Sequence, residues 1–391
     1  MELLQEFSIP LILGVVVAMA WANLAPASYD YFLHTSPFGE DSHVNVQFLV
    51  NDILMALFFG LAAKEITESC LPGGALNPLS KAVNPLLGCV GGVVTPIGIY
   101  FLWVALTDDP SIRNGWGVPT ATDIALAWLV ARMVFGKQHP AVQFLLLLAV
   151  VDDGIGLGLI AVFYPDPTYP VEPRALLLVV VAIGVAIALR RAKVTSFWPY
   201  VLIAGGVSWA GLFLAHLHPA LALVPVVPFM PKERADEGLF AEESSGVPHP
   251  DTLNRFEHFF KTPVDFGLFG FGLSNAGVAL ASMGNATAAV LVSLVAGKTI
   301  GVFVFSSIGH LLGFKLPNGM TFRALFVAGL TAGLGLTVAL FVAGQAFGGS
   351  DDILAAAKMG ALLSLLVAPV AMLLGAILRV KDQPTDRSTS A

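Results

Sequence analysis

This sequence carries little charge for its length. Asp, Glu, Lys and Arg make up 12% of its 391 residues, whereas soluble domains carry about 25%. Hydrophobic residues make up 56%, and the mean hydropathy is +0.79. So few charges cannot cover a water-exposed surface of ordinary composition. The composition therefore excludes a typical soluble protein and indicates a protein that spans a membrane.

Cysteine and catalytic motifs are scarce too. The two cysteines, Cys70 and Cys89, lack metal-ligand spacing, so neither a disulfide nor a zinc site is predicted. We find no catalytic serine, metal cluster or nucleotide-binding loop, which argues against an enzyme, a cofactor or a nucleic-acid partner. Residues 1–6 contain no Lys or Arg, unlike a cleavable signal peptide. The first apolar segment is therefore expected to remain as a span.

Long apolar runs fill most of the chain. A spanning helix needs about 20 mostly apolar residues, and this pattern predicts an all-α polytopic membrane protein with twelve transmembrane helices. Residues 1–380 form a single transmembrane domain, and the polar tail 381–391 is expected to be disordered. The predicted spans are residues 8–25, 47–66, 83–106, 116–136, 141–164, 174–190, 198–217, 219–230, 259–281, 286–312, 324–348 and 353–378.

The eighth segment, 219–230, is short enough to be re-entrant, and charge counting decides that it crosses. If it crosses and the N-terminus is cytoplasmic, inside loops and tail carry fifteen Lys and Arg, against only Arg113 and Arg174 outside. This strong positive-inside bias is lost if the segment does not cross. Both termini are therefore predicted on the cytoplasmic side of the membrane. Two long loops are expected, an acidic outer one at 27–46 and a mobile inner one at 231–256.

Spans four and eleven are both interrupted by residues that weaken helices. Gly115, Gly117 and Pro119 precede Asp123 in one, and 329–337 of the other reads Gly-Leu-Thr-Ala-Gly-Leu-Gly-Leu-Thr. Interrupted helices at matching places in two halves indicate a transporter's site near the bilayer midplane. Spans 3–5 and 10–12 would then be inverted repeats. Glycines that simply permit close helix packing are the alternative.

The fifth span carries two carboxylates side by side, Asp152 and Asp153. An ionisable residue deep in a span costs about 2.5–3.5 kcal/mol on insertion scales and is a functional hypothesis by default. Adjacent helical residues point about 100° apart, so both can face one polar cavity. Desolvation and mutual repulsion raise the proton affinity of at least one of them. A carboxylate of this kind can exchange a proton for a hard cation. The alternative is that the two aspartates bond to a distant arginine for structural reasons. The spans contain almost no arginine, which argues against this alternative.

Three further residues are placed to support this pair. Asp123 lies at the break in span four, where it can offset the positive ends of half-helices. Thr122 can offer oxygen to a cation, although a hydroxyl bonded to its own helix is an equal alternative. Lys298, near the middle of span ten, can pair with an aspartate of span five or offset the negative half-helix ends at the break in span eleven. Snorkelling to the interface is its alternative, and Lys358 in the last span is assigned no role.

Ionisable residues near the span ends give weaker signals. Asp52 lies near the outer end of span two, and Lys64 with Glu65 at its inner end is most simply interfacial. Glu257 and His258 open span nine on the inside, where a histidine can titrate at physiological pH.

These residues lie in motifs that resemble the NhaA family of bacterial sodium–proton antiporters. The motifs occur in family order from the first span to about Arg379. They are Asn51-Asp52-Ile-Leu-Met-Ala-Leu-Phe-Phe, Gly115-Trp-Gly-Val-Pro-Thr-Ala-Thr122-Asp123-Ile-Ala, Val150-Val-Asp152-Asp153-x-x-Gly156, His218-Pro219, Arg255-Phe-Glu257-His258, Ser274-Asn275-Ala-Gly-Val and Ala296-Gly-Lys298-x-x-Gly301.

The resemblance implies a bacterial inner-membrane protein with twelve spans, in which the broken fourth and eleventh helices cross. It also implies electrogenic exchange of one sodium (or lithium) for two protons, activation at alkaline pH, and commonly a homodimer. By motif, Asp152 and Asp153 are the cation and proton sites, with Thr122, Asp123 and Lys298 in support. Asp52 matches its motif position. The positions tied to pH response are Glu65, His218, Glu257 and His258.

Two features depart from the family pattern. In the family, basic residues typically follow the position of Glu65, but here the chain reads Ile66-Thr67-Glu68. The cytoplasmic entrance of the protein is therefore expected to be more acidic than is typical of the family. The outer loop 27–46 also looks shorter than the family's dimer-forming hairpin. Rival functions are an organic-anion carrier coupled to sodium, which would not require Lys298, and a channel, whose flux would follow the gradient without proton coupling.

Overall fold

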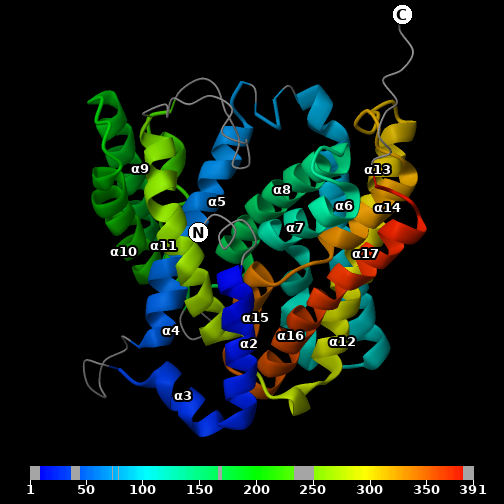
Figure 1. Cartoon of the computed structure of the whole chain (residues 1–391). Helices are drawn as coiled ribbons and strands as arrows, with labels where there is room; N and C mark the ends of the chain where they lie inside the picture. Colours follow the sequence, from blue (N-terminus) through cyan, green and yellow to red (C-terminus); the bar gives the residue numbers. More distant parts are fainter. Residues whose placement is uncertain are drawn as a thin grey trace, which may run out of the picture.

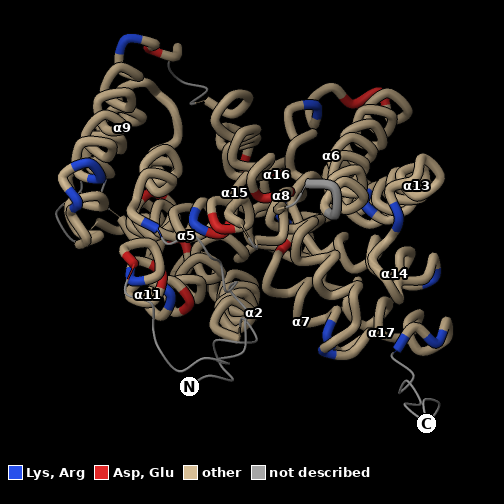
Figure 2. The backbone as a smooth tube through the Cα atoms, turned by 90° about the horizontal axis from the view of Figure 1, so that it is seen from above, with Lys and Arg blue, Asp and Glu red and all other residues tan. Residues whose placement is uncertain are grey.

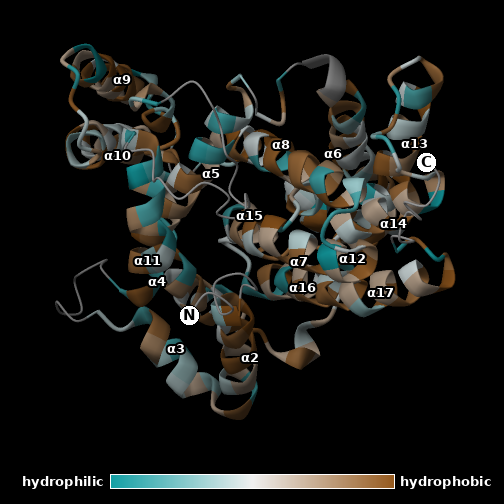
Figure 3. Ribbon diagram, turned by 45° about the horizontal axis from the view of Figure 1, so that its top comes forward, coloured by the Kyte–Doolittle hydropathy of each residue, from teal (hydrophilic) through white to brown (hydrophobic). Residues whose placement is uncertain are grey.

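The computed structural model describes residues 9–36, 45–72, 74–77, 79–165, 170–232 and 251–381, and these residues form helices and connections without a β-strand. Apolar residues dominate long helices such as α2 and α8 (Figure 3). The main helices are α2 (Ile9–Leu24), α3 (Pro26–His34), α4 (Val46–Phe48) continuing through a π-helical stretch η1 (Leu49–Leu54) into α5 (Met55–Ser69), α6 (Leu79–Thr107), α7 (Ile124–Phe135), α8 (Pro140–Phe163), α9 (Leu176–Arg191), α10 (Gly206–Leu214), α11 (Thr252–Asn275), α12 (Asn285–Val292), α13 (Lys298–Leu311), α14 (Phe322–Ala332), α15 (Thr337–Phe347), α16 (Asp351–Leu363) and α17 (Val367–Ile377).

The prediction of an all-helical membrane protein is confirmed. Within the described residues, six helices are long and apolar enough to cross a membrane, and two bent helix pairs bring the number to eight. The predicted first and seventh spans are shorter apolar helices, Ile9–Leu24 and Tyr200–Leu214. The ninth, α11, carries several charged residues in its first half. The total of twelve spans stays a prediction.

The two bent pairs lie where the sequence predicted broken helices. A 3₁₀ segment, η2 (Pro110–Thr120), meets α7 at 59°, and α14 meets α15 at 46°. Figure 1 shows α7 and α8 side by side in the middle of the molecule, with α15 next to them. Both breaks therefore lie inside the helical bundle.

The two predicted repeats, spans 3–5 and 10–12, pack on each other. α6 of span three packs along α13 of span ten, and their backbones touch at Gly91 and Gly301, where a β-carbon on either glycine would collide with the carbonyl oxygen of the other. α7 of span four packs on α17 of span twelve, and α14 of span eleven packs on α8 of span five. The two predicted repeats therefore contact each other through all three of their spans.

The eighth predicted span is not an α-helix. Between His218 and Lys232 the chain forms 3₁₀ turns, among them Pro219–Leu221 and Val227–Phe229. His218 lines a pocket with Asn51, whereas the charges acting on Lys232 include that of Glu68. The segment therefore runs alongside span two and parallel to it.

Its 3₁₀ geometry explains how so short a segment matches span two. A 3₁₀ helix rises about 2.0 Å per residue against about 1.5 Å for an α-helix, so about 14 residues cover the roughly 27 Å of 18 α-helical residues. This path is consistent with the expectation that the segment crosses. Its 3₁₀ conformation was not predicted.

The predictions for the two long loops were partly wrong. Residues 27–34 of the outer loop belong to helix α3, which begins at Pro26, a favoured first helical position. At the end of the inner loop, α11 begins at Thr252 because the Asp251 side chain accepts a hydrogen bond from the Asn254 amide and caps the helix. Residues 37–44, 233–250 and the tail after 381 lie outside the described residues.

Candidate functional site

The two broken spans are joined to each other at their breaks. The amide nitrogen of Asp123 donates to the carbonyl oxygen of Leu334 over 2.7 Å. Thr122 Oγ1 lies 3.0 Å from the carbonyl oxygen of Ala332, the last residue of α14. Interrupting two helices frees backbone groups that need partners inside a membrane. Each break therefore supplies partners for the other, and the glycine-packing alternative is not needed to explain these segments.

Asp123 caps two half-helices at once. Its Oδ1 accepts from the Leu126 amide at the start of α7 over 3.1 Å. Its Oδ2 accepts from Thr337 at the start of α15, from the amide over 3.3 Å and from Oγ1 over 3.0 Å. Both helices point their positive N-terminal ends at this carboxylate, which is only 4% exposed. Asp123 therefore lies between the N-terminal ends of two half-helices, and its part in transport stays a prediction.

Lys298 points into the protein rather than to an interface. Its side chain is 0% exposed, and its Nζ lies 2.5 Å from Asp152 Oδ2 and 2.8 Å from Thr122 Oγ1. It follows a π-helical stretch, Ser293–Gly297, a feature that often marks functional positions in helices. Of the alternatives left open by the sequence, the structure favours pairing with span five, and the aspartate is Asp152.

Asp152 is held by further donors. Thr122 Oγ1 lies 2.8 Å from Asp152 Oδ2, and its single hydrogen can serve either this oxygen or the Ala332 carbonyl. Cys89 Sγ, on α6, donates to Asp152 Oδ1 over 2.9 Å. Both oxygens of this buried carboxylate are therefore occupied. Sequence reasoning missed Cys89, because only the fold brings span three against span five.

Asp153 differs from its neighbour. It is 6% exposed, and its Oδ1 is buried without a hydrogen-bond partner among the described residues. The charges that act on it are those of Asp123, Asp152 and Lys298. A buried carboxylate oxygen without a donor is costly unless it binds a proton or a cation. Asp153 thus has a carboxylate oxygen available to a proton or a cation, whereas both oxygens of Asp152 already accept hydrogen bonds.

Lys64 was interpreted as interfacial, and this was wrong. Its side chain is 2% exposed, with Nζ 2.5 Å from Glu68, 2.6 Å from Glu257 and 3.1 Å from Glu65. Three carboxylates from α5 and α11 can keep an ammonium buried. Figure 2 shows acidic and basic residues side by side on α5, whereas most of the bundle is neither. Glu65 and Glu257 are thus brought together, and the unusual acid Glu68 joins them.

Within the described residues, neither histidine forms an ion pair with this cluster, although His258 follows Glu257 directly on α11. His258 is exposed on α11. His218 accepts a hydrogen bond from the Ala220 amide and makes an edge contact with Phe341, with ring centres 4.7 Å apart. Together with Asp52, His218 lines a polar pocket of about 290 Å³. Asp52 and Lys64 are twelve residues, or about 18 Å, apart along span two.

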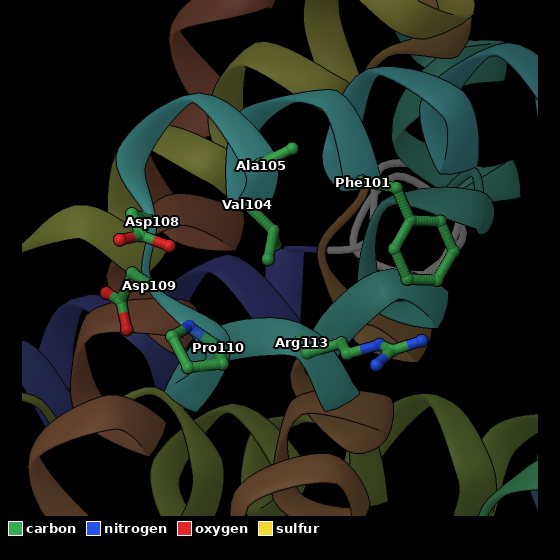
Figure 4. A pocket seen from close by; sticks show the side chains of 7 residues that line it. All are labelled: Phe101, Val104, Ala105, Asp108, Asp109, Pro110 and Arg113. Atoms are coloured by element: carbon green, nitrogen blue, oxygen red, sulfur yellow. The ribbon is translucent and has the colours of Figure 1, made fainter.

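A second pocket, of about 330 Å³, lies where α6 ends and η2 begins (Figure 4). Asp109 in its wall accepts hydrogen bonds from Ser111 and Asn285, which lower the pKa of this carboxyl below its usual value. None of the site residues that the sequence predicted lines this pocket. Its hydrogen bonds join the end of span three to the start of span ten, and we assign it a structural role.

Three further polar groups had no role assigned from the sequence. Ser364 of span twelve donates to the Gly335 carbonyl over 3.0 Å and accepts from the Gly335 amide over 3.2 Å, which stabilises the break in span eleven. Lys358 is buried in α16 and has no hydrogen bond or ion pair within the described residues. Asp265 in α11 has a buried Oδ2 without a partner there. Serine is too common in helices for the sequence to single out Ser364.

Comparison with known proteins agrees with the resemblance seen in the motifs. Residues 4–378 match the family model described as Na+/H+ antiporter 1. A protein of Geobacter metallireducens named Na(+)/H(+) antiporter NhaA is 58% identical, over 98% of this chain and 99% of its own length. Proteins of the same name from Geobacter sulfurreducens and Desulfitobacterium hafniense are 57% and 55% identical, over 98% and 97% of this chain and 99% and 96% of theirs.

Proposed function

Because this chain belongs to the Na+/H+ antiporter 1 family, we propose that it exchanges sodium or lithium for protons at Asp153 and Asp152, beside the crossed breaks. The observation that carries this assignment is the unequal state of the two carboxylates. Asp152 is held by Lys298 and Cys89, whereas Asp153 Oδ1 is buried without a partner in the described residues. Asp153 is the group that binds a proton or a sodium ion, but not both.

Sodium is a hard cation and prefers oxygen ligands, as calcium and magnesium do. Carboxylate oxygens of Asp153 and Asp152 and the hydroxyl of Thr122 supply such ligands at one place. Lys298 offsets one negative charge, so the empty site carries less repulsion than two bare aspartates. With two carboxylates and one ammonium, the site has enough titratable groups to carry two protons against one sodium. Such an exchange moves net charge, so we propose that transport is electrogenic and exports sodium.

We further propose that the Lys64 cluster sets the pH response. The four side chains of this cluster, Lys64, Glu65, Glu68 and Glu257, together carry a net charge of −2 when all three acids are ionised. Proton uptake relieves this repulsion, so the cluster changes charge as the cytoplasm acidifies. His258 and His218 lie outside the cluster, and their part in the response stays a prediction.

The test is cation-induced dissipation of a pH gradient in proteoliposomes, scanned over sodium, lithium, potassium and pH. For one competing proton, the apparent affinity for sodium falls about tenfold per pH unit below the titration midpoint, since each unit is about 1.4 kcal/mol. Asp153→Asn should abolish sodium-dependent exchange in a folded protein. Asp352→Asn, an exposed aspartate on α16, is the matched control. A half-saturation independent of pH, or full exchange in Asp153→Asn, removes the pair from the mechanism.

Orientation is proposed from the charge distribution. Topology reporters fused within residues 231–256 and after Arg379 are expected to report cytoplasm. A periplasmic signal from either would contradict the assignment. Homodimer formation, which the resemblance implies, is testable by the mass of the purified protein in detergent.

A further inference from the structure

Cys89 is the weakest of the three hydrogen-bond donors to Asp152, because the other two are an ammonium and a hydroxyl. Asp152 Oδ2 faces the Lys298 ammonium at 2.5 Å, and a charge-assisted bond of this kind is strong. Asp152 Oδ1 is held by the Cys89 thiol at 2.9 Å, and a thiol is a weak donor. The two oxygens of one carboxylate are therefore restrained very unequally.

Packing fixes the thiol at this place. Cys89 is 0% exposed, and α6 is pressed against α13 on either side of it. A β-carbon on the preceding Gly88 would lie 2.5 Å from Ser306 Oγ, and Gly91 touches the backbone of Gly301. Helix α6 therefore cannot turn away without breaking its contact with span ten.

We propose that Cys89 is a displaceable donor that holds Asp152 Oδ1 while no cation is bound and gives this oxygen up when sodium enters. The proposal rests on the proposed function, because it takes Asp153 as the first ligand. A sodium ion at the open Asp153 needs further oxygens, and Asp152 Oδ1 is the neighbouring carboxylate oxygen held only by a weak donor. Cys89 is thus a positioning residue that acts through Asp152.

A series at position 89 gives an ordered expectation. Cys89→Ala leaves Oδ1 without a donor in the empty site, which penalises that state and lowers the half-saturation concentration for sodium by about two- to tenfold. Cys89→Ser provides a stronger donor and raises it by a similar factor. If Cys89 only fills space, both variants instead lower the maximal rate or the yield of folded protein, without this order. That result would overturn the proposal.

The thiol also provides a direct spectroscopic readout. The chain has two cysteines, so in Cys70→Ala, which changes an exposed residue, the infrared S–H stretching band reports Cys89 alone. Sodium is expected to shift this band to higher frequency, since the hydrogen bond is lost, and potassium is expected to leave it unchanged. The role of Cys89 is overturned if the band stays unchanged at saturating sodium while the protein still exchanges sodium. The proposed function stands in that case, provided that Asp153→Asn loses exchange. Absence of sodium-dependent exchange in the unmodified chain overturns the proposed function itself.

Discussion

Lys298→Met removes the ammonium that faces Asp152, and we expect it to lower the stability of the protein. Lys298 Nζ lies 2.5 Å from Asp152 and 2.8 Å from Thr122, and both charged side chains are fully buried. Removing one partner of a buried pair leaves the other charge uncompensated, at a cost of about 3–5 kcal/mol. The thiol of Cys89 and the hydroxyl of Thr122 are neutral donors and cannot replace the lost charge.

The double variant Asp152→Asn/Lys298→Met separates the pair from its surroundings. With both charges gone, most of the lost stability is expected to return, because the desolvation penalty disappears with the pair. Exchange is not expected to return, since Asp152 supplies a ligand. Lys358→Met is the matched control. Lys358 is also a lysine buried in a span, but it has no ion pair among the described residues.

The free energy of unfolding is measured in mixed micelles titrated with a denaturing detergent, and exchange is measured in proteoliposomes. Lys298→Met is expected to lose stability, Lys358→Met to keep or gain it. If Lys298→Met is as stable as the parent protein, or if the double variant is no better than the single one, the buried ion pair does not contribute as argued.

Three further predictions concern the breaks, the helix contact and the charged cluster. Asp123→Ala removes the caps of two half-helices and is expected to cost about 1–4 kcal/mol in unfolding free energy, at about 0.5–2 kcal/mol per cap; a loss confined to transport rate would contradict this. Gly301→Ala forces α6 and α13 apart and is expected to cost about 1–3 kcal/mol and to slow exchange, whereas Gly98→Ala, with open space at its β-carbon, is expected to do neither. Glu257→Gln removes one of the acids around Lys64 and is expected to shift the pH profile of exchange without abolishing it; an identical profile would exclude the cluster as the pH-responsive element.

Much of the fold could be predicted because membrane spans have strong signals. Apolar runs marked the long helices, and the glycines and proline before Asp123 marked one break. Two adjacent aspartates in an apolar run stood out because charge there is costly. These signals are local in the sequence and need no knowledge of which spans touch.

The pairing inside the site could not be predicted in this way. Asp152 and Asp153 are adjacent and chemically identical, and only the arrival of Lys298 and Cys89 from other spans makes them unequal. Lys64 was misjudged because its position near a helix end indicates an interface, whereas Glu257 from α11 encloses it. The eighth segment was misjudged in form because twelve apolar residues suggest a short α-helix and carry no sign of the longer 3₁₀ rise.

The double cap at Asp123 has a consequence for how the chain is made. Asp123 and Thr337 are 214 residues apart, and ribosomes add about 5–20 residues per second. About 10–40 s of synthesis therefore separate the insertion of span four from the appearance of its partner break. During that interval the carboxylate can cap α7 through Leu126 but not α15, and the backbone groups freed at the first break lack the partners they have in the finished protein. Span four must spend this time close to water or to other proteins, which makes the break a place where assembly can be delayed or assisted.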